Sequence, residues 1–291
     1  MNAAMPEWFN AVVPHKMRLK QAESSHSFSV VRPRGLGGLL MPPFSKFDSA
    51  DELQEWVKAR LAGLDEQPRI SVIVPARNEQ QFLAATLRSV LCCDGAEIIV
   101  VDGQSSDRTA DIARWFGATV VSVSPSRGNQ LNAGAAVARA DVLLFLHADT
   151  CLPPDYVRTA CDVLHQPGTA AGAFTLQIDA SGLPFRLIEW GVRVRSNVFG
   201  RPYGDQAYFM KTRTFLACGG FPGLPRMEDY AMLARLRKLG RICVVPAHVR
   251  TSARSWQKYG PVRTILQHQW IILKYHLARG PREQRSYRPE S

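Results

Sequence analysis

The sequence predicts an α/β fold in which helices flank a mainly parallel sheet. Between residues 70 and 150, short apolar segments alternate with stretches whose apolar residues recur at helical spacing. The apolar segments have the length and composition of strands that are buried on both faces. Helices between consecutive strands imply right-handed crossovers and therefore parallel pairing. We expect a Rossmann-like half over residues 70–150, followed by a less regular half over residues 170–246.

Each element of the first half has a local signal. The expected strands are Ile70–Val74, Glu97–Val101, Thr119–Val123 and Val142–Leu146. Between them we expect a helix carrying Leu83, Leu87, Val90 and Leu91, a helix capped near Ser106 that ends at Phe116, and a helix from Gln130 to Arg139. A further helix begins at Pro154, and Pro167-Gly168 ends it.

Two terminal extensions flank this core. The sequence divides into an N-terminal extension over 1–68, one catalytic domain over 69–259 and a C-terminal segment over 260–291. In the first extension we expect a helix near Ser49–Leu61, preceded by a basic stretch that suits either a transit peptide or a disordered tail. The segment Pro261–Ala278 has the pattern of a basic amphipathic helix, which either packs on the domain or makes peripheral contact with an anionic membrane.

Composition limits the classes of partner. The chain has 291 residues, and 36 Lys and Arg against 25 Asp and Glu give a net charge of +11. This charge favours anionic partners such as nucleotides or lipid phosphates. Because the basic residues are spread along the chain without an aromatic-basic recognition motif, we expect no nucleic-acid partner.

Cysteine spacing and hydropathy bear on the compartment. The cysteines at 92, 93, 151, 161, 218 and 243 contain no CxxC pair, which predicts reduced, mostly buried thiols. No apolar run approaches the roughly 18 residues of a membrane-spanning helix, so we expect a protein that is not integral to a membrane. The expected location is the cytoplasm, with peripheral membrane contact as an option, or an organelle interior if residues 1–47 are a transit peptide.

Chemically active side chains follow the expected strands. The segment Pro75–Glu79 follows the first strand, Asp102 ends the second, and His147-Ala148-Asp149 ends the fourth. Since ligands of open α/β sheets bind beyond the carboxyl ends of the strands, these side chains are candidates for one site. Gly204-Asp205-Gln206 and Glu228-Asp229 are further clusters downstream. Taken separately, a strand-terminal Asp can equally cap a helix, and paired acids can complement a helix dipole.

Two nucleotide-binding motifs are absent. The first strand is followed by neither GxGxxG nor GxxxxGK[ST], which counts against a dinucleotide oxidoreductase and a P-loop enzyme.

The order of the motifs resembles a known family. The strings SVIVPARNE, VVDGQSSDRTAD, FLHADT, ACGGFP and MEDYAML occur in the order of glycosyltransferase family 2 enzymes, which have the GT-A fold and use nucleotide-diphospho-sugars. The strings SRGNQLNAGA, LHADTCLPPDY, YGDQAYF and TSARSW resemble its radical-SAM/selenodomain-associated transferase 2 branch. The resemblance covers about residues 69–259.

The resemblance implies a role for each matching residue. Asp229 would be the general base that takes a proton from the acceptor hydroxyl, and Glu228 would support it or bind the acceptor. Asp205 and Gln206 are assigned to the acceptor side. The residues implied to contact the nucleotide-sugar are Pro75, Arg77, Glu79, Asp102, Arg127, Ala148 and Asp149.

The same resemblance implies a metal. Asp149, as the second acid of a DxD motif, would bind Mn²⁺ or Mg²⁺ between the phosphates, and the metal would stabilise charge on the leaving diphosphate. His147 stands where many relatives have the first Asp, and imidazole suits Mg²⁺ poorly. Three readings follow: a Mn²⁺ site, a site with Asp149 as the sole protein ligand, or a His147 that hydrogen-bonds phosphate.

Three functions are compatible with these motifs. The first is an inverting glycosyltransferase that uses a UDP- or GDP-sugar and an acceptor that the sequence does not identify. The second is a catalytically silent sugar-nucleotide-binding protein, against which the Glu228-Asp229 pair argues. The third, nucleotidyl transfer, is disfavoured because the glycine-rich triphosphate loop is absent.

Overall fold

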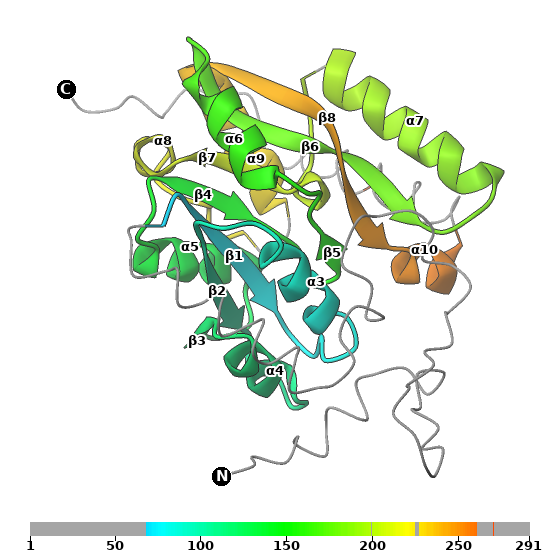
Figure 1. The fold of residues 1–291 in the computed structure, drawn as a ribbon. Helices are drawn as coiled ribbons and strands as arrows, with labels where there is room; N and C mark the ends of the chain where they lie inside the picture. Colours follow the sequence, from blue (N-terminus) through cyan, green and yellow to red (C-terminus); the bar gives the residue numbers. More distant parts are fainter. Residues whose placement is uncertain (1–67, 199, 225–226, 261–269, 271–291) are drawn as a thin grey trace, which may run out of the picture.

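The computed structural model, which describes residues 68–198, 200–224, 227–260 and 270, is built on one eight-stranded sheet (Figure 1). The strand order is β3-β2-β1-β4-β7-β6-β8-β5. In chain order the strands are β1 (Ile70–Ala76), β2 (Ala96–Asp102), β3 (Thr119–Ser122), β4 (Val142–Phe145), β5 (Thr150–Cys151), β6 (Thr169–Asp179), β7 (Tyr208–Lys211) and β8 (Arg241–Ser252). The predicted α/β class with a mainly parallel, mixed sheet is confirmed.

The register of the strands decides where a ligand could lie. β1 pairs in parallel with both β2 and β4, and β2 pairs in parallel with β3. β7 runs antiparallel to β4, with Tyr208 opposite Phe145. The carboxyl ends of β1, β2 and β4 and the amino end of β7 therefore meet at one edge of the sheet.

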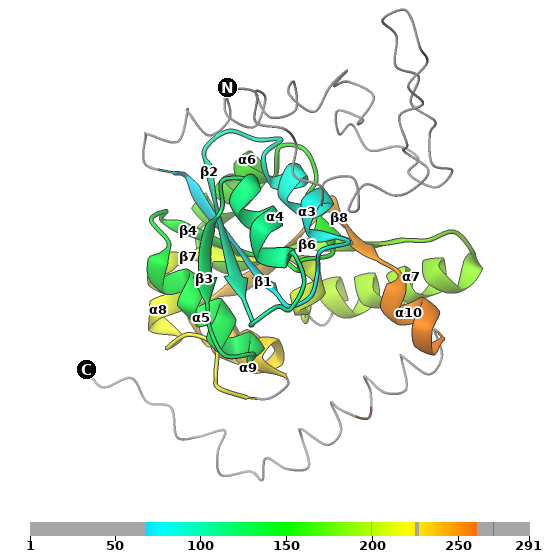
Figure 2. The same cartoon turned by 90° about the horizontal axis from the view of Figure 1, so that it is seen from below.

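Helices cover both faces of the sheet (Figure 2). The apolar residues of α3, α4 and α6 belong to one buried cluster, and those of α5, α8 and α9 belong to a second cluster on the opposite face. The helical elements are α3 (Leu83–Val90), α4 (Thr109–Trp115), α5 (Arg127–Val137), α6 (Tyr156–His165), α7 (Leu183–Val198), the 3₁₀ turn η4 (Gly204–Gln206), α8 (Thr212–Ala217), α9 (Glu228–Leu239) and α10 (Arg254–Tyr259).

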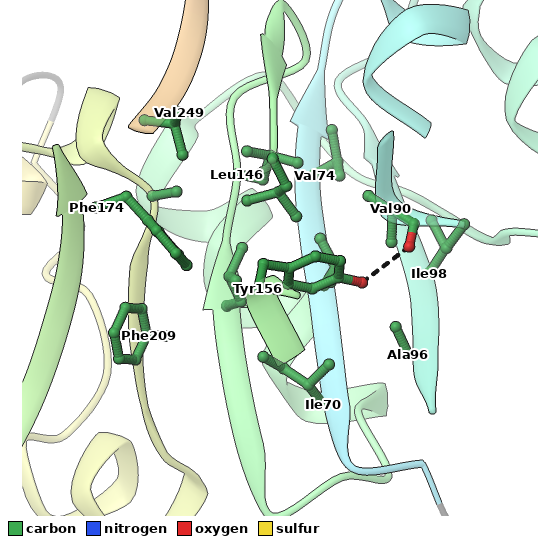
Figure 3. Close-up of a cluster of buried hydrophobic side chains, with 14 of the residues drawn as sticks. Ile70, Val74, Val90, Ala96, Ile98, Leu146, Tyr156, Phe174, Phe209 and Val249 are labelled. Atoms are coloured by element: carbon green, nitrogen blue, oxygen red, sulfur yellow. Dashed lines mark hydrogen bonds between the residues drawn. The ribbon is translucent and has the colours of Figure 1, made fainter. Parts of the chain in front are cut away.

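Tyr156 shows how the first cluster accommodates a polar group (Figure 3). Its side chain is fully buried, and its hydroxyl donates a hydrogen bond to the carbonyl of Val90 at 3.0 Å. A buried phenol without a partner would cost free energy, so this bond lets α6 pack against the end of α3.

The predicted elements of the first half are all present, with shifted ends. α5 begins at Arg127, three residues before the predicted start, because Ser126 is extended and its carbonyl accepts a hydrogen bond from the Gln130 N–H at 2.8 Å. β4 ends at Phe145, although the Leu146 N–H still donates to the Ile73 carbonyl at 2.9 Å. The early start of α5 moves Arg127 from a loop to the first turn of a helix.

The predicted helices of the two terminal extensions lie almost entirely outside the described residues. The helix expected near Ser49–Leu61 and nearly all of the Pro261–Ala278 helix fall outside them, and the division at residues 68 and 259 stays a prediction. All six cysteines are free thiols, but the expectation that most of them are buried is wrong, because only Cys161 and Cys218 are buried and the other four are half-buried. Within the described ranges, no helix has the length and apolar character needed to cross a membrane.

Candidate active site

The loops that follow β1 and β2 are joined by hydrogen bonds. Asn78 has a positive φ of 55°, a conformation that Asn tolerates, and its Oδ1 accepts from the Ser106 N–H at 2.8 Å. Its own N–H donates to Ser105 Oγ at 2.9 Å. Asp102 is buried at the end of β2, and its two carboxylate oxygens accept from the Ser105 N–H at 3.3 and 3.2 Å. The two strand ends are thereby held in a fixed relation.

β4 brings His147 and Asp149 to the same edge. Both residues are half-buried, whereas Ala148 between them lies in the apolar core. The Ala148 carbonyl accepts a hydrogen bond from Thr86 Oγ1 at 2.8 Å, which ties this turn to α3. The implied nucleotide-sugar contact at Ala148 therefore has a buried side chain and an occupied carbonyl.

Asp229 lies in the first turn of α9, and two backbone N–H groups fix its carboxylate. Oδ2 accepts from the Gly204 N–H at 3.0 Å, and Oδ1 accepts from the Tyr230 N–H at 2.7 Å. A methyl group added to Gly204 would lie 3.2 Å from Asp229 Oδ2 and 3.5 Å from His147 Nε2, so these two side chains border Gly204 from two sides.

One pocket collects side chains from five elements. Of the predicted site residues, it contains Pro75, Arg127, His147, Glu228 and Asp229. The remaining lining residues, most of them apolar, are Leu131, Phe145, Leu146, Gly204, Tyr208 and Phe221. The carboxylates, the guanidinium and the imidazole thus face a partly apolar space, in which electrostatic interactions are stronger than in water.

Charge distribution in the pocket depends on Arg127. Its guanidinium contacts Nε2 of His147, and its Nε lies 3.3 Å from Glu228 Oε1. Burial, together with the charges of Arg127 and Arg254, holds the pKa of His147 well below its usual range, so the imidazole is neutral at neutral pH. Burial also raises the pKa of Glu228, and the Asp229 charge adds to this, while Arg127 opposes it.

Arg254 reaches the site from the start of α10, and it is not among the residues predicted from the sequence. Its Nη1 lies 2.7 Å from Glu79 Oε2, and its Nη2 lies 2.6 Å from Glu79 Oε1. Nη2 is also 3.2 Å from Asp149 Oδ2. The segment TSARSW contains this arginine and belongs to the family resemblance, which implies no role for it. Its place beside Asp149 follows from the pairing of Thr150 in β5 with Thr251 in β8.

The other predicted site residues are not part of the pocket lining; they are Arg77, Glu79, Asp102, Ala148, Asp149, Asp205 and Gln206. Arg77 is exposed just beyond β1. Gln206 is buried, where its Oε1 accepts from Ser196 Oγ at 2.7 Å and its Nε2 donates to the Phe174 carbonyl at 2.9 Å. Gln206 therefore anchors η4 to α7 and β6, and neighbouring Asp205 is half-buried in the same turn. The acceptor assignments of Asp205 and Gln206 stay predictions.

The surroundings of Asp149 and His147 bear on the predicted metal. Mg²⁺ and Mn²⁺ are bound mainly by oxygen ligands. Within the part of the chain that the structure describes, no three His, Cys, Asp or Glu side chains are grouped to hold a metal ion. Asp149 already lies against Arg254, and His147 lies against Arg127. Because each predicted ligand has a guanidinium neighbour, this donor set does not fit a dication held by the protein.

Comparison with known proteins places this site in context. The chain is 39% identical over 100 residues to the 4,4'-diaponeurosporenoate glycosyltransferase of Staphylococcus haemolyticus, a match over 31% of this chain and 27% of that protein. The chain thus spans about a quarter of the length of this relative.

Two solved structures share the fold. TarS 1-349 of S. aureus in complex with UDP-GlcNAc aligns with a TM-score of 0.53 and 19% identity, over 63% of this chain and 58% of that one. The mannosyltransferase PcManGT of Pyrobaculum calidifontis, in complex with GDP-Man and Mn²⁺, aligns with a TM-score of 0.51 and 20% identity, over 68% of this chain and 63% of that one. These likenesses agree with the GT-A fold expected from the sequence.

A family model covers the whole pocket. The model described as Glycosyl transferase family 2 matches residues 71–230, which include every pocket residue from Pro75 to Asp229 and more than half of the chain. The chain therefore belongs to glycosyl transferase family 2.

Proposed function

We propose that this chain transfers a sugar from a nucleotide-diphospho-sugar to an acceptor hydroxyl with inversion at the anomeric carbon. The observation that carries the proposal is the convergence of Arg127, His147 and Asp229 in one pocket at the carboxyl ends of the parallel strands. Complexes of TarS with UDP-GlcNAc and of PcManGT with GDP-Man support a UDP- or GDP-sugar as the donor class.

Asp229 is the general base of this proposal. Its carboxylate takes the proton from the acceptor hydroxyl while the acceptor oxygen forms a bond to the anomeric carbon. The bond between that carbon and the β-phosphate oxygen breaks, and the nucleoside diphosphate leaves with the electron pair. The N–H groups of Gly204 and Tyr230 orient Asp229, and a carboxylate with two such bonds keeps lone pairs for the proton.

Arg127 acts on the leaving group. It lies in the first turn of α5, an 11-residue helix whose amino end carries partial positive charge. The guanidinium and the helix end together favour the negative charge that develops on the diphosphate. Neutral His147 beside Arg127 adds no cationic charge of its own, but it can orient the guanidinium by accepting a hydrogen bond.

The nucleoside is proposed to bind over the ends of β1 and β2. The side chain of Asp102 accepts from the Ser105 N–H with both oxygens and retains lone pairs for a ribose or base. Metal assistance by Mn²⁺ or Mg²⁺ stays a prediction from the sequence, and no step of the mechanism proposed here passes through a metal.

The test is turnover by an Asp229→Asn variant. A panel of UDP- and GDP-sugars is offered with sugar-lipid and sugar-phosphate acceptors, and nucleoside diphosphate release is measured. Loss of the base should lower kcat by roughly 10²- to 10⁴-fold, while the donor Kd from calorimetry changes little. The matched control is Asp162→Asn, a carboxylate of α6 whose side chain is 67% exposed.

Two outcomes would count against the proposal. Normal turnover by Asp229→Asn would remove Asp229 as the base. Donor binding by the unaltered protein without any transfer or hydrolysis across the panel would favour the catalytically silent sugar-nucleotide-binding protein.

Several finer assignments also remain proposals. They are the radical-SAM/selenodomain-associated transferase 2 branch, peripheral membrane contact through residues 260–291, and a cytoplasmic or organellar location. The unidentified acceptor is proposed to approach from the η4 side, next to Asp229.

A further inference from the structure

We propose that Arg254 is a diphosphate-binding residue of the donor site, and that the guanidinium groups of Arg254 and Arg127, in place of a divalent metal, contact the diphosphate there. The inference rests on the proposed function because it concerns the same donor. Each of the two predicted metal ligands lies against an arginine: His147 against Arg127 and Asp149 against Arg254.

The Arg254 guanidinium contacts two acidic side chains. Arg254 Nη2 lies 3.2 Å from Asp149 Oδ2, so an arginine of the chain itself is paired with the carboxylate assigned to the metal. The same guanidinium makes two contacts with Glu79, at 2.7 and 2.6 Å. Glu79 belongs to the loop after β1, and Asp149 follows β4. Arg254 therefore joins the loop that follows β1 to the turn that follows β4.

Further contacts hold Arg254 in place. The Arg254 N–H donates to Ser252 Oγ at 3.2 Å, and Cζ lies 4.7 Å from the ring centre of Phe82. A guanidinium held by two carboxylates and an aromatic ring loses little further freedom when it binds an anion. The hydrogen bond with Glu79, moderated by burial, raises the pKa of Arg254, so its charge is permanent.

Arg254 keeps N–H donors beyond those that contact Glu79 and Asp149. A guanidinium has five N–H donors, and the contacts with Glu79 and Asp149 account for three of them. The remaining donors suit phosphate oxygens, with which arginine forms strong charge-assisted bonds. A divalent metal ion has no planar set of N–H donors. It would also have to displace Arg254 from Asp149 before it could bind this carboxylate.

Arg127 is the second arginine of this pair. It contacts His147, whereas Arg254 contacts Asp149, and the charges of both arginines act on the His147 ring. Both cations thus lie next to the turn that follows β4. A diphosphate bound at this turn would meet both guanidinium groups.

The experiment measures the binding of UDP and GDP by calorimetry, with Mn²⁺ in one series and EDTA in the other. The unaltered full-length chain should bind one of the two nucleotides in EDTA with a Kd close to that in Mn²⁺. Arg254→Gln should weaken binding in EDTA by roughly 10- to 100-fold, the loss expected for one or two charge-assisted hydrogen bonds. Arg254→Lys keeps the positive charge but not the planar set of N–H donors, so its affinity for the nucleotide should lie between those of the unaltered chain and Arg254→Gln.

Controls separate a local effect from misfolding. Arg158→Gln removes an arginine of α6 whose side chain is 81% exposed, and it should bind nucleotide like the unaltered chain. Thermal melting of each variant monitors the fold, and restored binding in Arg254→Gln on addition of Mn²⁺ would show a folded site in which a metal replaces the missing charge.

Two results would overturn the inference. Abolition of nucleotide binding by EDTA in the unaltered chain would make the metal indispensable, and Arg254→Gln with unchanged affinity in EDTA would remove Arg254 from the site. In either case, Mn²⁺-dependent sugar transfer would leave the proposed function standing. If neither nucleotide binds under any condition, the donor site itself is wrong.

Discussion

Glu97 is a buried carboxylate that links three segments at the amino end of the sheet. Its Oε1 accepts from the Ser71 hydroxyl and from the Arg139 N–H at 2.6 Å, and its Oε2 accepts from Arg139 Nε at 2.9 Å. Burial alone would raise the pKa of Glu97, but the hydrogen bonds from Ser71 and Arg139 outweigh burial and lower it. The folded chain therefore favours the ionised form.

We expect Glu97→Gln to lower the free energy of unfolding by about 1–3 kcal/mol at neutral pH, because it weakens this buried network. The folded pKa lies below the unfolded value of about 4.3, so the contribution is present above that pH and is lost as the pH falls through the folded value. Urea unfolding of both proteins between pH 7 and pH 3 measures the difference.

The control for this prediction is Asp111→Asn on α4, whose carboxylate is 57% exposed and should matter little. A stability gap between Glu97→Gln and the unaltered chain that stays constant down to the lowest pH would contradict the assignment.

Apart from Arg127, which the family resemblance supplied, the pocket residues predicted from the sequence are those whose place could be read from a strand end or a helix start. Pro75 is at the end of a β-branched run, His147 follows an apolar run, and Asp229 begins a helix. Arg254 could not be found in this way. Its distance from Asp149 depends on the pairing of β8 with β5, and local sequence patterns do not specify which strands pair.

At the scale of elements, α5 packs unusually close to the sheet. A Cβ built on Gly134 would lie 2.4 Å from Ile73 Cγ2 and 3.0 Å from Val101 Cγ2. Only a residue without a side chain allows this approach. Because Arg127 begins the same helix, Gly134 also sets how far the guanidinium reaches toward His147.

Two glycine substitutions should have opposite effects. In the interior of a helix, replacing Gly by Ala raises the free energy of unfolding by about 0.5–1 kcal/mol where the methyl group has room. A Cβ on Gly191 in α7 would meet no atom within 4 Å, so Gly191→Ala should stabilise the fold. Gly134→Ala should destabilise it, because overpacking costs about 1–3 kcal/mol. Chemical denaturation of both variants measures the two signs.

If Gly134→Ala proves as stabilising as Gly191→Ala, the close contact between α5 and β1 is incorrect. Where Gly134→Ala folds but is less stable, its affinity for UDP or GDP should also fall, because the backbone of α5 carries Arg127 away from its partners.

The first half of the fold follows closely from the sequence, and the second half does not. The strands from β1 to β4 alternate with helices, so right-handed crossovers account for the parallel pairing of these strands. The order of the strands in the sheet is not sequential, because β4 pairs with β1, β7 lies between β4 and β6, and β8 lies between β6 and β5. These positions depend on long-range packing that a local pattern does not encode.

At the scale of the whole molecule, burial is concentrated in the centre of the sheet. Val72, Ile73 and Val74 in β1 are completely buried, whereas the residues of edge strand β3 are exposed or half-buried. The free energy needed to open the backbone should therefore differ between these strands.

Amide hydrogen exchange should show this gradient. We expect the amides of Val72–Val74 to exchange only through global unfolding, with the full free energy of unfolding, and those of β3 to exchange through smaller openings. Exchange followed by mass spectrometry of proteolytic peptides measures both. Equal protection of β1 and β3 would mean that the sheet opens as a single unit.

The contact between Glu79 and Arg254 joins residues 175 positions apart in the chain. Contacts of such separation form late in folding, since the entropy of closing a long loop must be overcome first. During synthesis, the strands that carry Glu79 and Asp149 leave the ribosome well before Arg254 does. A nascent chain therefore exposes these two acidic side chains without their arginine until β8 has joined the sheet and α10 has folded.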